Sequence, residues 1–165
     1  MGTPRARRSS PRGATLTVAT VPTKLASQQI ASLRGKAKAS FLLAVHDIRR
    51  RGCAAAGVRL AGEAFSGVCR LDLYGRWRLL TVFEAPDRCV LLLVAEHTRS
   101  ANPYRLLYAA LGIDEPGEPR TKPSCCDAEG QPPIEPDLVE RFEQGMRDLG
   151  RVLPASARTP TRRRR

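Results

Sequence analysis

The sequence lacks any apolar run that approaches the roughly 20 residues needed to span a bilayer. Its arginine-rich beginning also lacks the apolar stretch that defines a secretory signal. Both absences argue against a membrane or secreted protein. We therefore expect a cytoplasmic protein without a membrane partner.

Cysteine is present in an odd number, five, at irregular spacing. Without a secretory signal such a set does not predict a disulfide framework, so we expect reduced thiols. The adjacent Cys125 and Cys126 lack the two-residue gap of zinc knuckles, and neither histidine lies near them in the sequence, so we expect no metal and no other cofactor. Cys69 and Cys89 fall at apolar positions of predicted strands, where a small buried hydrophobe is the ordinary explanation.

The net charge of +12 is unevenly distributed along the chain. Residues 1–13 hold four arginines and residues 154–165 hold five, with no acidic residue in either, which leaves +3 for the residues between them. Segments rich in Arg, Pro and Ser bury too little surface to fold, so both are predicted to be disordered basic tails. They favour nonspecific contact with RNA, DNA or acidic partners, and a solvated tail without a dedicated partner is the alternative.

The length of 165 residues and the 42% of apolar residues suffice for one domain with one core. A β-branched stretch at residues 15–21, which Pro22 ends, predicts a short opening strand. Residues 24–33 and 36–51 are rich in good helix formers, and Gly35 separates them. This part of the sequence therefore predicts a strand followed by a helical hairpin.

The pattern then changes to strands. Residues 69–73 alternate apolar and polar side chains, Gly75 marks a turn, and residues 77–83 form the next strand. The continuous apolar run of residues 89–95 is typical of a central strand covered on both faces. Three antiparallel strands in a meander, with the opening strand and the helical hairpin packed on one sheet face, predict an α+β sandwich.

The C-terminal part predicts two further helices. A short helix is expected over residues 104–111, and residues 114–136, rich in Pro, Gly and charge, predict a linker or an ordered loop. Apolar residues then recur at helical spacing, which predicts an amphipathic helix over residues 137–152. Residues 114–153 thus form an extension whose apolar stripe packs on its own domain or, alternatively, docks a partner.

The chemistry-bearing residues lie in two segments, GVCRLDLYGRWRLLTVF and CVLLLVAEHTRSANPY. The segments supply a basic residue on one strand, an Arg in a Gly, aromatic, Arg context on the next, and a basic, His-bearing stretch before a Tyr. These residues are Arg70, Arg78, His97, Arg99 and Tyr104. In order and spacing the segments resemble the signature half of the RelE/ParE toxins. The opening strand and the helical hairpin match as well, so the resemblance covers residues 14–113.

The resemblance implies the toxin of a type II toxin–antitoxin system, a ribosome-dependent mRNA endonuclease that arrests translation. Its implied partners are a cognate antitoxin, the ribosome and mRNA. Such cleavage needs no metal if the 2′-OH attacks its own phosphate while a base, an acid and cations assist. Here His97 and Tyr104 move protons and Arg78 stabilises the transition state. Arg70 and Arg99 hold the substrate phosphate.

Asp72 leaves an alternative open. If residues 74–76 form a three-residue hairpin loop, Asp72 lies directly across from Arg78 and the two make a cross-strand ion pair. An acidic residue here repels phosphate unless Arg78 neutralises it. Asp72 and the small core charge also fit a ParE-type, non-enzymatic inhibitor of DNA gyrase, or a family-fold protein-binding module. Strand capping by His97 and core packing by Tyr104 are the corresponding structural explanations.

Overall fold

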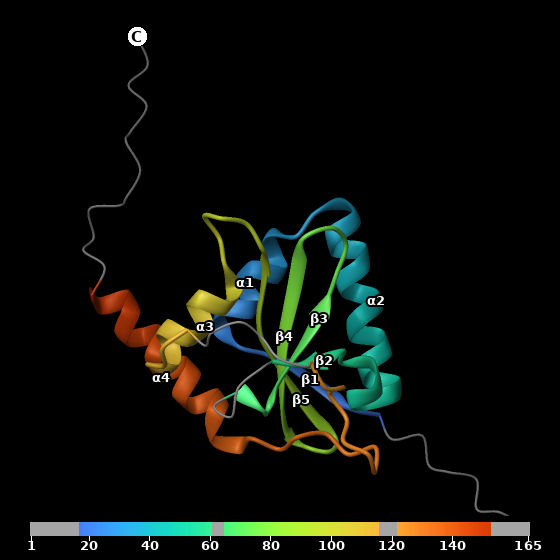
Figure 1. Ribbon diagram of the computed structural model, residues 1–165. Helices are drawn as coiled ribbons and strands as arrows, with labels where there is room; N and C mark the ends of the chain where they lie inside the picture. Colours follow the sequence, from blue (N-terminus) through green and yellow to red (C-terminus); the bar gives the residue numbers. More distant parts are fainter. Residues whose placement is uncertain (1–16, 61–64, 116–121, 153–165) are drawn as a thin grey trace, which may run out of the picture.

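The computed structural model describes residues 17–60, 65–115 and 122–152. The predicted tails, residues 1–13 and 154–165, lie outside these ranges. The chain forms a mixed five-stranded sheet with helices on both faces (Figure 1). The elements are β1 (Ala19–Pro22), α1 (Lys24–Ser32), α2 (Gly35–Arg51), the short 3-10 helix η1 (Gly52–Ala55), β2 (Val58–Arg59), β3 (Val68–Asp72), β4 (Trp77–Ala85), β5 (Arg88–Glu96), α3 (Pro103–Leu111) and α4 (Pro136–Val152).

The strand order in the sheet is β1-β5-β4-β3-β2. β2 to β5 form antiparallel neighbours, whereas β1 lies parallel to β5 at one edge. The parallel pairing requires a long crossover, which the helical hairpin and the other strands provide. The predicted α+β class, opening strand, helical hairpin and meander are thereby confirmed. The two-residue strand β2 was not predicted, because two residues are too few to show a period.

Local chemistry explains where the hairpin helices begin and end. The Thr23 hydroxyl accepts a hydrogen bond from the Ala26 amide at 3.1 Å and donates one to the Leu92 carbonyl at 2.7 Å. It therefore caps α1 and ties it to β5. Gly52 ends α2 with φ of 59°, a left-handed conformation that favours glycine. The basic residues Arg49, Arg50 and Arg51 occupy the last turn of α2, as expected from the helix dipole.

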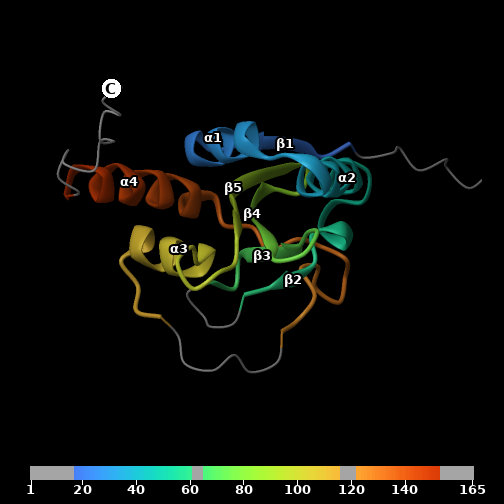
Figure 2. The same cartoon turned by 90° about the horizontal axis from the view of Figure 1, so that it is seen from above.

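The sheet separates two clusters of buried side chains. α1 and α2 pack on one face and α3 on the other (Figure 2). β5 contributes Leu91 and Val94 to the first cluster and Leu92 and Leu93 to the second. The apolar run of β5 is therefore explained by a central strand that is covered on both faces, as its sequence predicted.

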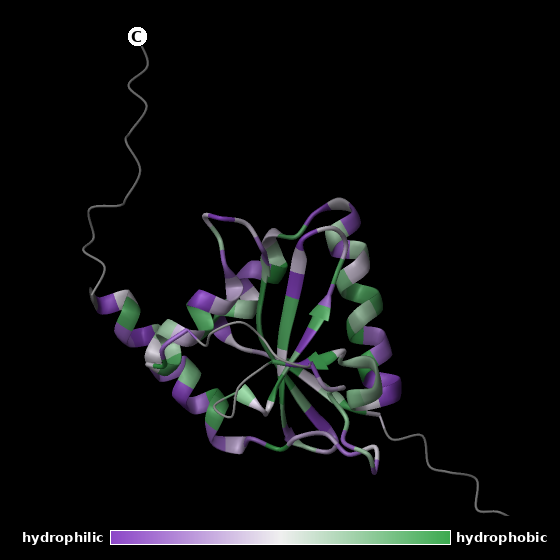
Figure 3. Cartoon of the chain, viewed as in Figure 1, coloured by the Kyte–Doolittle hydropathy of each residue, from purple (hydrophilic) through white to green (hydrophobic). Residues whose placement is uncertain are grey.

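α4 packs on its own domain. Hydrophilic and hydrophobic residues alternate along the helix (Figure 3), and Leu138 and Phe142 are buried in the cluster shared with α3. The two helices approach closely at Gly145, where an added Cβ would lie 1.6 Å from the Ala110 carbonyl oxygen. The predicted amphipathic helix and its intramolecular packing are confirmed. No helix in the described ranges is both long enough and apolar enough to cross a membrane.

The segment before α4, residues 122–135 and here called the strap, is ordered against the sheet. Ser124 makes an antiparallel bridge with Val58, and the Arg59 amide donates to the Pro123 carbonyl at 2.8 Å. At the other end of the strap, the Glu135 amide donates to the Phe83 carbonyl at 3.0 Å. Of the two structures predicted for this region, the described residues therefore form an ordered loop.

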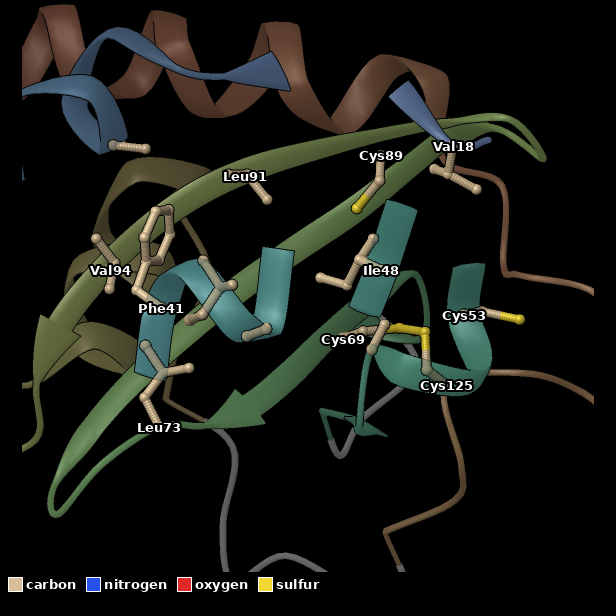
Figure 4. Close-up of a cluster of buried hydrophobic side chains, with 14 of the residues drawn as sticks. Val18, Phe41, Ile48, Cys53, Cys69, Leu73, Cys89, Leu91, Val94 and Cys125 are labelled. Carbon is tan, nitrogen blue, oxygen red and sulfur yellow. A yellow bond between two sulfur atoms is a disulfide. The ribbon is translucent and has the colours of Figure 1, made fainter. Parts of the chain in front are cut away.

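Four of the five cysteines form disulfides, so the prediction of reduced thiols was wrong. Cys53 is bonded to Cys126 and Cys69 to Cys125, and Figure 4 shows the second bond beneath α2. The partners are 73 and 56 residues apart and meet because the strap lies across β2. Sequence spacing gave no sign of this contact. Cys89, in contrast, is unpaired and fully buried, as predicted, and burial raises its pKa to about 12.

Candidate functional site

A groove of about 690 Å³ lies where β5 ends, β4 begins and α3 begins. It contains three of the five predicted site residues, Arg78, His97 and Arg99. Its described lining carries no acidic side chain. The lining residues are Arg76, Arg78, His97, Thr98, Arg99, Asn102 and Arg105.

Backbone hydrogen bonds fix the loop that forms one wall of the groove. The His97 amide donates to the Arg76 carbonyl at 2.8 Å, which extends the β4–β5 ladder by one residue. Thr98 then closes a turn, because its amide donates to the Ala101 carbonyl and its hydroxyl accepts from the Ala101 amide. The Asn102 side chain accepts from the first amides of α3 and caps this helix. Arg99 and Arg105 are thereby held on either side of the cap.

Arg78 both lines the groove and pairs with Asp72. The two residues are direct cross-strand partners, and Arg78 Nε lies 2.9 Å from Asp72 Oδ1. Arg78 Nη1 also donates to the carbonyls of Trp77 and Gly75. The predicted three-residue hairpin loop and its ion pair are therefore confirmed. The Arg78 side chain is 19% exposed, so its guanidinium is held in one place beside the groove.

Arg70 lies outside the groove lining and shares the same carboxylate. Its Nε lies 3.1 Å from Asp72 Oδ1, and its Nη2 donates to Asp72 Oδ2 at 3.2 Å. Asp72 is 53% exposed, so solvent screens both pairs, and such pairs contribute roughly 0–1 kcal/mol to stability. The arrangement places one carboxylate between two guanidinium groups. A phosphate at the groove edge would compete with Asp72 for Arg78.

Tyr104 lies next to His97 but does not line the groove. The two rings meet edge to face, with their centroids 5.3 Å apart. The Tyr104 hydroxyl is buried and has no hydrogen-bond partner among the described residues. The structure thus brings His97 and Tyr104 together and places the phenol hydroxyl beneath the surface. In this conformation the hydroxyl does not reach a ligand in the groove.

Two arginines of the groove were missed by the sequence reasoning. Arg76 is the last residue of the hairpin loop, directly before β4, and lines the same groove as Arg78. The short spacing of the two arginines was a signal available in the sequence. Arg105 stands in the first turn of α3, where no basic motif marks it, and lies 3.4 Å from Glu115. Together the side chains provide several cations and one imidazole around a hollow, which suits a phosphodiester. The described residues contain no cluster of three or more His, Cys, Asp or Glu arranged to hold a metal.

Comparisons with known proteins find a similarity among solved structures alone. A scan of protein-family models finds no match, and no curated protein matches. Among solved structures, the toxin–antitoxin complex RelBE2 from Mycobacterium tuberculosis is similar, with 21% identity and a TM-score of 0.37. The similarity covers 49% of this chain and 99% of that chain.

Proposed function

We propose that this chain is a RelE-type toxin, a ribosome-dependent mRNA endonuclease that arrests translation and is neutralised by a cognate antitoxin. The observation that carries the proposal is the basic groove around His97. Residues 65–115 contain six arginines and six acidic residues, so their net charge is zero. Four of these arginines line the groove and none of the acidic residues does. This segregation supports a polyanionic ligand.

The roles follow from position. His97 is the group in the groove suited to proton transfer near neutral pH, and Arg78 lies beside it as the fixed cation for the developing phosphorane charge. Arg99 holds a neighbouring phosphate. Arg70 acts through Asp72 by sharing its carboxylate, and Tyr104 acts through His97 by packing against its ring. These two are positioning residues in the proposal.

The proposal places the protein in the cytoplasm, where the ribosome is and where thiols are kept reduced. The two disulfides are typical of an oxidising compartment instead. No cysteine lines the groove, and the strap contributes no residue to it. We therefore propose that the chemistry of the groove needs neither disulfide, although the fold that carries the groove is less stable when the four cysteines are reduced.

A second candidate is a non-enzymatic, ParE-type inhibitor that binds a protein target such as DNA gyrase. The observation that favours it is Asp72, whose carboxylate engages both Arg70 and Arg78. The buried Tyr104 hydroxyl favours it as well. In an endonuclease, Arg78 must leave Asp72 and bind the substrate phosphate instead. A protein-binding surface can keep the pair of Arg78 and Asp72 intact.

Induced expression of the full chain tests both candidates. If the proposal holds, growth arrest is accompanied by new 5′ ends in ribosome-associated transcripts, mapped by primer extension. Replacing His97 with Ala removes the proton-transfer group and lowers cleavage by about 10²–10⁴-fold. His46→Ala is the matched control, because His46 is exposed on α2 away from the groove, and it cuts like the parent. Arrest with intact transcripts and altered DNA supercoiling would instead establish the second candidate.

A further inference from the structure

The tip of the β3–β4 hairpin carries an exposed aromatic side chain beside the groove. Tyr74 is 52% exposed and lies two residues before Arg76, which lines the groove. Two residues span at most about 7 Å of chain, so the backbone that carries the ring adjoins the residue that lines the groove. Lys36 of α2 places its ammonium group 5.3 Å from the centre of the Tyr74 ring. An aromatic face and a cation are thus presented together to solvent.

The main chain holds this tip in place although the ring is exposed. The Tyr74 amide donates to the Ser40 hydroxyl at 3.1 Å, which docks the tip on α2. The Leu73 amide donates to the Trp77 carbonyl at 2.9 Å, and Gly75 adopts φ of 63°, so the turn is closed. The backbone of Tyr74 is therefore held in place, while its ring remains exposed to solvent. Such a fixed platform loses little entropy when a planar group stacks on it.

The surroundings of the tip are strongly basic. Residues 34–38, at the beginning of α2, contain three Lys or Arg residues and no acidic residue. Arg34, Lys36 and Lys38 are exposed around the beginning of α2. In Figure 1 the beginning of α2, the tip of the β3–β4 hairpin and the loop between β5 and α3 lie at the same end of the molecule. Basic residues thus flank Tyr74 on both sides, the groove on one and α2 on the other.

We propose that this rim is a binding track for single-stranded RNA that continues the groove, with one base stacked on Tyr74 and the neighbouring phosphates near Lys36. The inference rests on the proposed function and extends it to the path of the substrate. Single strands are bound without sequence preference by basic channels that carry aromatic platforms, because every base offers a π-face. A duplex keeps its bases stacked on one another and cannot use Tyr74 in this way.

Equilibrium binding to labelled RNA octamers tests the stacking contact. The parent protein is compared with Tyr74→Ala and Tyr74→Phe, using an intact octamer and an octamer that lacks bases at all positions. We expect Tyr74→Ala to weaken binding of the intact octamer on the order of tenfold, Tyr74→Phe to retain it, and neither to alter binding of the abasic octamer. Ile134→Ala is the control for loss of an exposed apolar side chain, because Ile134 lies on the strap. Equal binding of both octamers by the parent and Tyr74→Ala would refute the platform.

The salt dependence of octamer binding tests the cationic part of the track. Lys36→Gln should lower the slope of log affinity against log salt by about 0.7, the value for one phosphate contact to a single strand. Arg50→Gln removes the same charge 14 residues along α2, about 21 Å away, and should leave the slope unchanged. Equal slopes for both variants would overturn the track.

A mononucleotide separates this inference from the proposed function, because a single nucleotide held in the groove has no neighbouring base to stack on Tyr74. Arg78→Ala should weaken binding of the mononucleotide, whereas Tyr74→Ala should not. If Arg78→Ala weakens both ligands and the Tyr74 and Lys36 variants bind like the parent, the track is wrong and the groove stands. If the parent protein binds neither ligand, the track is wrong, and the mapping of ribosome-associated transcripts still decides the proposed function.

Discussion

The two disulfides make a prediction about stability whose size follows from their topology. Closing a loop of 56 residues through Cys69 and Cys125 stabilises the folded state by about 4 kcal/mol in the chain-entropy description. The Cys53–Cys126 bond then closes a much shorter additional loop, because Cys125 and Cys126 are adjacent. That loop comprises the stretch from Cys53 to Cys69, about 17 residues, and contributes about 3 kcal/mol more.

Removing either pair by alanine substitution should therefore cost about 3 kcal/mol, and removing both should cost about 7 kcal/mol. The effects are not additive. When one disulfide is removed, the disulfide that remains still closes most of the same loop, so each single removal costs less than half of the combined loss. The sum of the two separate losses falls short of the combined loss by about 1 kcal/mol. Folded domains have a total stability of only about 5–15 kcal/mol, so the protein without both bonds is marginal.

Urea unfolding of the oxidised full chain measures these values. The variants are Cys53→Ala with Cys126→Ala, Cys69→Ala with Cys125→Ala, and all four substitutions together. Cys89→Ala is the matched control, because it removes a buried sulfur without removing a crosslink. A loss below about 1 kcal/mol for the fourfold variant, corrected by this control, would refute the reasoning and show that hydrogen bonds alone hold the strap.

Three further outcomes are expected. Asp72→Asn releases Arg78 and removes a charge that repels phosphate, so the affinity for the RNA octamer should rise several-fold. The free energy of unfolding should change by no more than about 1 kcal/mol. Unchanged affinity would show that Asp72 does not restrain Arg78 in the groove. Gly145→Ala should destabilise α4 by several kcal/mol in thermal unfolding because its Cβ would overlap backbone, whereas Gly150→Ala, which meets open space, should stabilise by about 0.5–1 kcal/mol. The Cys89 pKa is raised from 9.0 to about 12, so the folded state retains a proton that the unfolded state loses above pH 9. Stability should therefore fall by about 1 kcal/mol from pH 8 to pH 10, and Cys89→Ala should lack this component.

Most of the fold follows from short-range patterns in the sequence. Each of these elements buries one face or runs through the core: the two hairpin helices, the meander and α4. The spacing of their apolar residues therefore predicts both the type of element and the face that is buried. The strap left no such record, because an irregular segment is held by backbone hydrogen bonds and by cysteines whose partners lie 56 and 73 residues away. The spacing of the cysteines in the sequence therefore could not predict that the strap brings them together as disulfides.

In the candidate site, too, some contacts follow from local sequence patterns and others depend on tertiary packing. The pairing of Asp72 with Arg78 follows from the length of one turn, because a three-residue loop fixes the register of the strands beside it. The contact of His97 with Tyr104 depends on how α3 folds back after β5, and the direction of the Tyr104 hydroxyl depends on packing around it. Neither is encoded in a local pattern. Sequence reasoning identified the residue types of the site but not which atoms reach the groove.

Net charge is a poor guide to this groove, and the reason lies in the length of β4. The strand has nine residues, which span about 30 Å, so its two ends carry separate electrostatic environments. At one end Arg76 and Arg78 line the groove. Near the other end Arg88 forms an ion pair with Glu84. A segment with zero net charge therefore places four arginines around one groove. Arg78 and Arg105 are paired with Asp72 and Glu115, whereas Arg76 and Arg99 form no ion pair among the described residues. The small core charge is consequently no argument against a phosphate ligand, because recognition depends on the local field of the groove and not on the sum over the domain.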